Sequence, residues 1–136
     1  ATATGATLEI ESLGPPYSEF VHDLDLVDKY RKNAETLGRT FDTTPRKGAG
    51  STDMANVSLL MPTIHPMLGL DSGSAVNHQP EFAAYCRTPV ADQAALDGAV
   101  AMALTAVDAA TDDSTRTRLL KQETSYSQIE QYPWSF

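Results

Sequence analysis

Short apolar stretches along the chain predict β-strands at three places. In residues 6–12, Leu8 and Ile10 alternate with polar neighbours, as in a strand that has one face in solvent. Residues 57–61 and 67–70 are short apolar runs that lack this alternation. Such runs are typical of strands covered on both faces. We therefore expect strands of a well-covered sheet, together with one strand that is half exposed.

Two longer stretches carry apolar residues at helical spacing. Residues 23–37 predict a helix that Asp23 caps at its start and that Gly38 ends with a left-handed turn. Residues 92–110 predict a second helix, which packs closely on a sheet, and Asp112 marks the start of a further one. We expect the packing stripe of the second helix to consist of Leu96, Val100, Ala103, Val107 and Ala110.

The polar segments predict loops. Residues 41–50 read as a loop that leads into a functional site. Residues 125–136 end in aromatic side chains, which either dock on the domain or belong to a disordered tail.

The composition restricts the class of protein. The chain has 136 residues, 41% hydrophobic and 21% charged, as expected for one globular domain. A net charge of -8 argues against binding of a phosphate backbone, which needs clustered Lys and Arg. No stretch approaches the ~20 apolar residues of a membrane-spanning helix. We expect no nucleic acid and no membrane as partners, and a soluble, cytoplasmic protein. Cys86 is alone and cannot form an internal disulfide.

Three short segments have the residue types of an active-site loop. Residues 50–58 begin with glycine and small hydroxylated residues, which let a ligand approach the backbone closely, and Asp53 follows them. Residues 62–66 and 77–82 each contain a histidine. Imidazoles and carboxylates are metal ligands as well as hydrogen-bonding groups, so this order looks like that of active-site loops.

The three segments resemble, in sequence and in order, the C-terminal part of zinc-dependent peptidases of the aminoacylase, carboxypeptidase G and aminobenzoyl-glutamate hydrolase family. They read Gly-Ser-Thr-Asp-Met-Ala-Asn-Val-Ser at 50–58, Pro-Thr-Ile-His-Pro at 62–66 and Asn-His-Gln-Pro-Glu-Phe at 77–82. The resemblance extends over residues 4–111. One departure is Ala55, where the family has glycine, and a positive φ angle there would strain the alanine.

The resemblance implies an α/β fold. Members of the family are longer than this chain and have a mixed-sheet catalytic domain with flanking helices, into which a lid or dimerisation domain is inserted. Residues 1–14 would then be the end of the lid domain with its last strand, and residues 15–136 the C-terminal part of the catalytic domain. The first residue is alanine rather than methionine, so we expect a processed chain or a piece of a longer one.

The resemblance also implies that this chain holds one ligand of a two-zinc site. In the family, the last ligand of that site is a histidine that is followed by a glutamate. His78 and Glu81 match this pair. The alternative is a surface histidine that stabilises a turn before Pro80. The His-x-Asp motif and the Glu-Glu pair, which carry the other ligands and the general base, do not occur in this sequence. We therefore expect no catalytic residue in this chain.

Four further residues are candidates for contact with a substrate. The resemblance implies that Asp53 shapes the pocket, with Ser51 and Asn56 in the same role, whereas capping or an Asx-turn is an equal alternative for Asp53. His65 is either a pocket residue or a hydrogen-bonded histidine inside the domain. We assign His22 to the start of the helix that follows it, and not to a metal site.

Two functions remain open at this point. The first is a part of a metal-dependent hydrolase that cleaves an amide bond of an N-acyl or peptidyl amino acid, inactive as this chain alone. Its partners would be the N-terminal part of the same enzyme and a second copy in a homodimer, and its cofactor would be zinc. The second is a free-standing small α/β binding or interaction module without catalysis.

Overall fold

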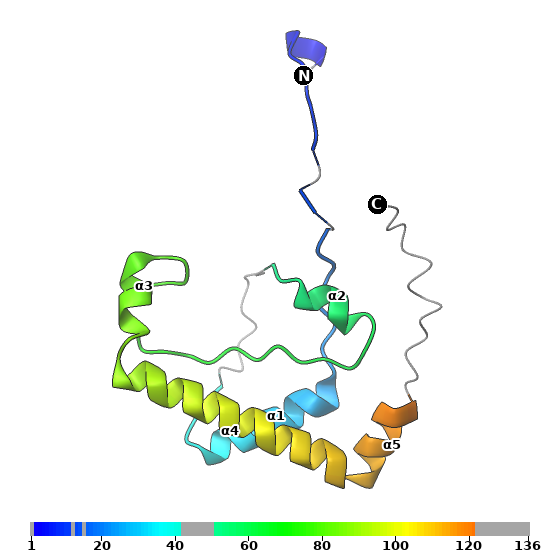
Figure 1. The fold of residues 1–136 in the computed structure, drawn as a ribbon, viewed down its shortest axis with the longest axis vertical. Coiled ribbons are helices and arrows are strands. Elements are labelled where there is room, and N and C mark those ends of the chain that lie inside the picture. The colour runs from blue at the N-terminus through cyan, green and yellow to red at the C-terminus, as the bar shows by residue number, and fades with distance from the viewer. Residues whose placement is uncertain (1, 12, 15, 42–50, 122–136) are drawn as a thin grey trace.

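The fold is that of a computed structural model, which describes residues 2–11, 13–14, 16–41 and 51–121. These residues form helices joined by extended segments, and Figure 1 shows α1 and α4 crossing at the base of the molecule. The predicted loop at 42–50 and the tail at 125–136 lie outside the described residues. The helices are the short 3-10 helix η1 (Thr2–Thr4), α1 (Leu24–Thr36), α2 (Met54–Ser58), α3 (Pro80–Tyr85), α4 (Pro89–Thr111) and α5 (Asp113–Lys121).

The predicted α/β class with a mixed sheet is wrong, because the described residues contain no strand. The run at 57–61 begins inside α2 instead, and a short apolar run alone cannot distinguish a buried helix from a strand. Residues 6–11 and 67–70 have no regular secondary structure. A strand needs a neighbour to satisfy its backbone N–H and C=O groups, and neither segment has one among these residues.

The helix predicted at residues 23–37 is confirmed as α1, together with both of its ends. The Asp23 carboxylate accepts a hydrogen bond from the Leu26 amide at 3.1 Å, which satisfies a donor of the first turn. At the other end Gly38 has a φ angle of +81°, and its amide donates to the Glu35 carbonyl at 3.0 Å. Glycine is favoured in this left-handed conformation because glycine has no Cβ atom.

The helix predicted at 92–110 is confirmed as α4, and the helix after Asp112 as α5. Thr88 caps the start of α4, and Pro89 occupies its first turn, where a missing N–H costs nothing. Asp112 ends α4, and its carboxylate accepts hydrogen bonds from the Ser114 and Thr115 amides at 2.9 and 3.0 Å. One residue therefore separates two helices and caps the second.

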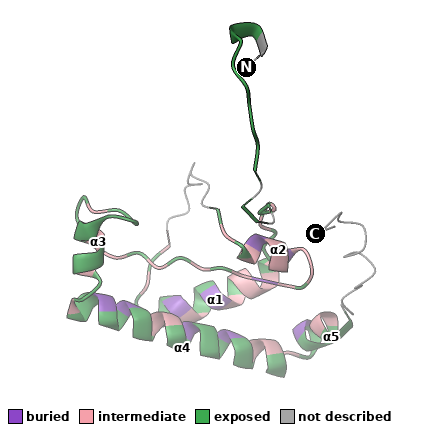
Figure 2. Ribbon diagram, turned by 45° about the horizontal axis from the view of Figure 1, so that its top comes forward, coloured by how far each residue is buried: buried purple, intermediate pink, exposed green. Residues whose placement is uncertain are grey.

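The core lies where α1 crosses α4. Tyr30 and Ala34 of α1 and Ala101 of α4 are buried there, with Phe41 and Ile64 packed around them. Figure 2 shows buried positions, in purple, on both helices. Because two of the three are alanines, the helix backbones can approach closely.

Polar side chains join α4 to α1 and to the turn that follows α1, at the edge of this core. The Asn33 side-chain amide donates to Asp108 at 2.7 Å, and the Arg39 guanidinium forms an ion pair with Asp97 at 2.6 Å. Hydrogen bonds from Gln93 and Arg39 hold the pKa of Asp97 below its usual range. These contacts need specific partners, so they fix how the two helices face each other.

The predicted packing stripe of α4 is wrong. The helix turns the opposite face toward α1, with Ala91, Ala94 and Ala101 buried, whereas Leu96 and Val107 are 60% and 55% exposed. The cause is that α4 is apolar on all sides, so its periodicity does not select one face. The small alanines allow the close crossing, and Leu96 and Val107 are left exposed on the other face.

By length and composition alone, α4 also qualifies as a membrane-spanning helix, contrary to the expectation that no stretch would. An 18-residue window within Pro89–Thr111 has a mean hydropathy of 1.3, and 22% of that window is buried. This is weak evidence for a membrane span, because core helices pass the same test. The contacts of Asp108 with Asn33 of α1, and of Asp97 with Arg39 just after α1, are those of a helix that packs on protein.

A charged cluster fastens α5 to the start of α1. Arg118 binds Asp23 at 2.6 Å and Asp25 at 3.1 Å, and the Thr115 hydroxyl donates to Asp25 at 2.7 Å. Burial raises the pKa of Asp23, but hydrogen bonds from Arg118 and the Leu26 amide outweigh it and leave that pKa below its ordinary value. The Thr115 hydroxyl, followed by Arg118, also lowers the pKa of Asp25.

These carboxylates predict an acid-sensitive attachment of α5. A lowered pKa contributes stability that is present above the ordinary value of 3.8 and is lost as pH falls through the lower folded-state value. Arg118→Gln should therefore raise both pKa values and lower stability by roughly 1 kcal/mol, since the pair is partly exposed. Carboxyl NMR titration and chemical denaturation measure these effects. Arg116→Gln is the matched control, because its partner Asp113 lies within α5, and equal titration of the two variants would contradict the assignment.

The outer face of α4 predicts association of the isolated chain. Leu96 and Val107 on this face should bind a hydrophobic dye and promote self-association. Leu96→Gln combined with Val107→Gln should reduce both while helix content is kept. Ala101→Gln, on the face buried against α1, should instead reduce helix content. Sedimentation, dye fluorescence and circular dichroism test this, and a monomeric wild-type chain without dye binding would show the expectation to be wrong.

Candidate functional site

In the loop before α2 the carboxylate of Asp53 is exposed, and its Oδ1 atom accepts a hydrogen bond from the Thr52 hydroxyl at 3.5 Å. Asp53 stands at the start of α2 but makes no capping hydrogen bond with its side chain. The Thr52 hydroxyl takes that role by accepting a hydrogen bond from the Met54 amide at 3.3 Å. Ser51 and Asp53 are both exposed. Capping, the structural alternative for Asp53, is therefore carried out by its neighbour.

Ala55 lies inside α2 and is 2% exposed. Among the described residues other than glycine, His78 alone has a positive φ angle. The strain that alanine would suffer in a left-handed conformation is thus absent at this position.

Two side chains of α2 hold the segment that precedes α1. The Asn56 Oδ1 atom accepts from the Ser18 amide at 2.8 Å, and its Nδ2 atom donates to the Pro16 carbonyl at 3.2 Å. The Ser58 hydroxyl accepts from the Val21 amide at 2.9 Å. Both ends of the Asn56 amide are therefore engaged with the chain itself, in a positioning role that the sequence did not indicate.

The segment that contains His22 lies next to the segment that contains His65. The Asp23 amide donates to the Thr63 carbonyl at 3.0 Å, which joins the two stretches of backbone. The Phe20 ring lies close to both imidazoles, with centroid distances of 4.4 Å to His22 and 6.1 Å to His65. Both histidines line a hollow of about 220 Å³. His65 is exposed, so the alternative of a histidine inside the domain does not describe it.

His78 lies on an exposed turn directly before α3, with a φ angle of +66°. Histidine is one of the few non-glycine residues that enter this region with some frequency. The Gln79 side chain accepts from the Val76 amide at 3.3 Å and closes the turn. The imidazole of His78 is thereby held at the surface by a defined backbone.

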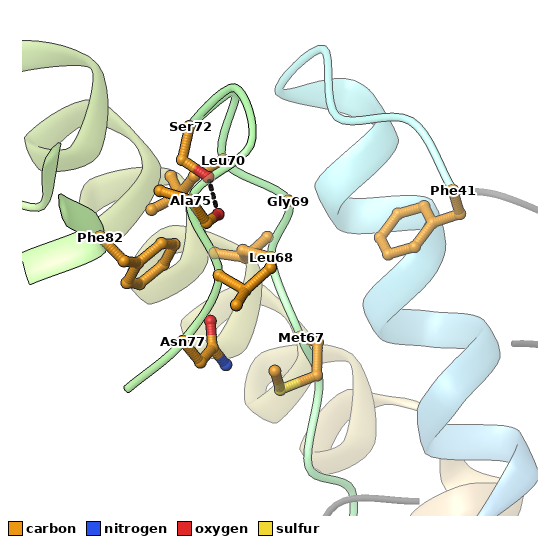
Figure 3. A pocket seen from close by; sticks show the side chains of 10 residues that line it. Phe41, Met67, Leu68, Gly69, Leu70, Ser72, Ala75, Asn77 and Phe82 are labelled. Atoms are coloured by element: carbon orange, nitrogen blue, oxygen red, sulfur yellow. Dashed lines mark hydrogen bonds between the residues drawn. The ribbon is translucent and has the colours of Figure 1, made fainter. Parts of the chain in front are cut away.

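A larger hollow of about 670 Å³ lies next to this turn. Figure 3 shows Asn77 and Phe82 on the left and Phe41, which follows α1, on the right. The extended segment with Leu68 lies in the middle of the view. Gly98 of α4 makes room for that segment, since a Cβ atom there would lie 2.5 Å from Leu68. Phe41 and Met67 line both this hollow and the one at His65, so the two hollows adjoin.

The motif segments are not gathered around one point. Figure 1 and Figure 2 show α2, next to Asp53, and α3, next to His78, near opposite ends of α4. Nowhere in the described ranges do three His, Cys, Asp or Glu side chains come close enough to hold a metal ion. His78 therefore offers a single ligand, and these residues do not by themselves fit a zinc site, which needs three or four protein ligands.

Sequence reasoning missed several residues that line the two hollows, among them Arg31, Tyr30 and Met67. Tyr30 and Arg31 were predicted only as helix residues. Periodicity indicates on which face of a helix a residue lies, but not which other segment packs across that face. Phe20, two positions before His22, carried the one local signal, since alternate residues of an extended segment point to the same side.

Comparison with known proteins gives two curated relatives. The chain is 34% identical over 111 residues to proteins named Xaa-Arg dipeptidase from Mus musculus and from Homo sapiens. The matched part is 79% of this chain but only 26% and 25% of those relatives, so the chain spans about a quarter of their length. No family model and no solved structure matches. The similarity supports a family of peptidases and amidohydrolases.

Proposed function

We propose that this chain is part of a metal-dependent hydrolase that cleaves an amide bond of an N-acyl or peptidyl amino acid. The observation that carries the proposal is the 34% identity to the two dipeptidases. A match covering 79% of the chain necessarily includes residues 50–82, where the three motif segments lie. The name of the relatives denotes a dipeptide as substrate, which agrees with a peptidyl amino acid as the substrate class.

In this proposal His78 contributes one ligand to zinc, and the other ligands lie outside this chain. Bound zinc would lower the pKa of a water molecule and polarise the amide carbonyl. The left-handed turn holds the imidazole at the surface, accessible to the remaining ligands. The hollow beside Asn77 and Phe82 offers an apolar wall for the body of the substrate.

The remaining candidates act on the substrate and not on the metal. Ser51 and the exposed carboxylate of Asp53 would shape the pocket in the complete polypeptide, and His65 lines the adjoining hollow. Asn56 would act indirectly, because its amide already holds residues 16–18.

We further propose that this chain works with the N-terminal part of the same enzyme, in a cytoplasmic homodimer. The apolar face of α4 that lacks a partner within the described residues is consistent with such a neighbour. The same face would serve a free-standing interaction module without catalysis. The intact mass of the natural protein separates the two: a longer chain with the His-x-Asp and Glu-Glu motifs supports the enzyme.

The first test compares this chain with the complete polypeptide. The 136-residue chain alone should bind zinc weakly and leave an N-acyl amino acid intact, because one histidine does not retain the ion. The complete polypeptide should bind zinc and hydrolyse the substrate. Metal-dependent hydrolysis by the isolated chain would refute the proposed division of the site.

The second test addresses His78 in the complete polypeptide. His78→Asn keeps a residue that tolerates the left-handed backbone but removes the imidazole, so zinc content should fall and turnover should drop by orders of magnitude. His65→Ala is the matched histidine control and should keep the zinc. Plasma mass spectrometry gives the metal content and steady-state kinetics the turnover. Full metal content in His78→Asn would exclude His78 as a ligand.

The third test separates pocket shaping from metal binding at Asp53. Asp53→Asn should raise KM or lower kcat in the complete polypeptide while zinc content stays nearly unchanged, because the carboxylate contacts substrate and not metal. Asp113→Asn, an exposed carboxylate on α5, serves as the control. Loss of zinc in Asp53→Asn would instead assign this residue to the metal.

A further inference from the structure

The hollow between His22 and His65 combines an apolar wall with polar groups at its edge. His22, Arg31 and His65 supply nitrogen atoms, and they come from three different parts of the chain. Phe20 and the bond between the Asp23 amide and Thr63 hold two of these parts together. The rest of the lining is apolar or aromatic and consists of Val27, Tyr30, Phe41, Ile64, Pro66 and Met67.

Arg31 is the cation in this hollow that the fold itself does not use. Within the described ranges Lys29, Arg39 and Arg118 all form ion pairs with aspartates, whereas Arg31 forms none. A guanidinium that lines a hollow without a carboxylate partner is suited to bind one from a ligand, because it presents two parallel N–H donors.

Two of the carboxylates near the hollow, Asp23 and Asp25, are neutralised by other residues, whereas Asp28 and Glu35 of α1 are exposed. Asp23, which directly follows His22, is bound by Arg118 at 2.6 Å, and Asp25 is bound by Arg118 and Lys29 at 3.1 and 3.2 Å. Their charges are thus partly cancelled locally, although the chain as a whole has a net charge of -8. An anion entering the hollow would meet less repulsion than the net charge suggests.

We propose that this hollow binds a small carboxylate with an apolar body, with the Arg31 guanidinium on the carboxylate and the imidazoles of His22 and His65 beside it. The volume of about 220 Å³ is sufficient for a phenyl ring with a short acid side chain. The buried Tyr30 ring forms part of the floor on which such a body packs. We take the natural ligand to be the carboxylate end of a substrate or product, and this identity rests on the proposed function. The existence of the site does not depend on the proposed function.

The experiment titrates the 136-residue chain with phenylacetate and follows the ring signals of its three histidines by carbon-edited NMR. The signals of His22 and His65 should shift in a saturable manner, while that of His78, which does not line the hollow, should not move. Phenylethylamine and phenylethanol have the same apolar body with a cation or a neutral group, and should bind at least tenfold more weakly.

Arg31→Gln should weaken phenylacetate binding by about tenfold, the loss expected for a charge-assisted hydrogen-bond pair. Lys32→Gln is the matched control, because this neighbouring cation does not line the hollow. Both side chains are exposed, and circular dichroism verifies that the helices persist. The proposal is overturned if no saturable shift occurs, if the alcohol or amine binds as well, or if the two variants bind alike. The assay involves no catalysis, so a failed hydrolase test leaves it standing.

Discussion

The close crossing of α1 and α4 is the contact on which the other described elements depend. Ala34 and Ala101 bring the backbones together, and Tyr30 fills the space beside them. Alanine pairs supply little apolar area, so the polar links of Asn33 and Arg39 to α4 are needed to set the geometry. Helix α5 then reaches back to α1 from the end of α4. The helix pair is therefore a frame, and the candidate site lies on the chain that crosses it.

That chain, residues 54–79, has few regular hydrogen bonds of its own and is held mainly by side chains. The side chains of Asn56 and Ser58 form hydrogen bonds with the segment before α1. The Thr63 carbonyl accepts a hydrogen bond from the amide of Asp23, the N-cap of α1. Leu68 rests against α4 at Gly98. An extended segment laid across two helices leaves hollows on either side of each point of contact. This explains why two hollows adjoin at Met67 although no cleft separates two domains here.

Local chemistry in the sequence was sufficient for some features. Asp23, Gly38 and Asp112 mark helix ends because their capping bonds reach only three or four residues. The predicted strand at 57–61 was wrong because a strand depends on distant partners. The predicted stripe of α4 was wrong because a helix with apolar residues on every face has no preferred one. For the site, the motif singled out His65 and His78 but left open whether His65 lies inside the domain, and the structure has both exposed. Arg31 was not predicted as a pocket residue. The surface of α1 at Arg31 lines a hollow only because residues 64–67 pass across it.

The carboxylates of α4 have a further consequence during synthesis of the chain. A segment as apolar as Pro89–Thr111 is of the kind that a translocon tests for insertion as it emerges from the ribosome. An aspartate near the centre of such a segment costs about 2.5 to 3.5 kcal/mol on insertion scales, several times what one leucine or valine contributes. Asp97, near the middle of the segment, thus biases the nascent helix against the bilayer, and the chain that follows α1, already synthesised, then provides Arg39 as its partner.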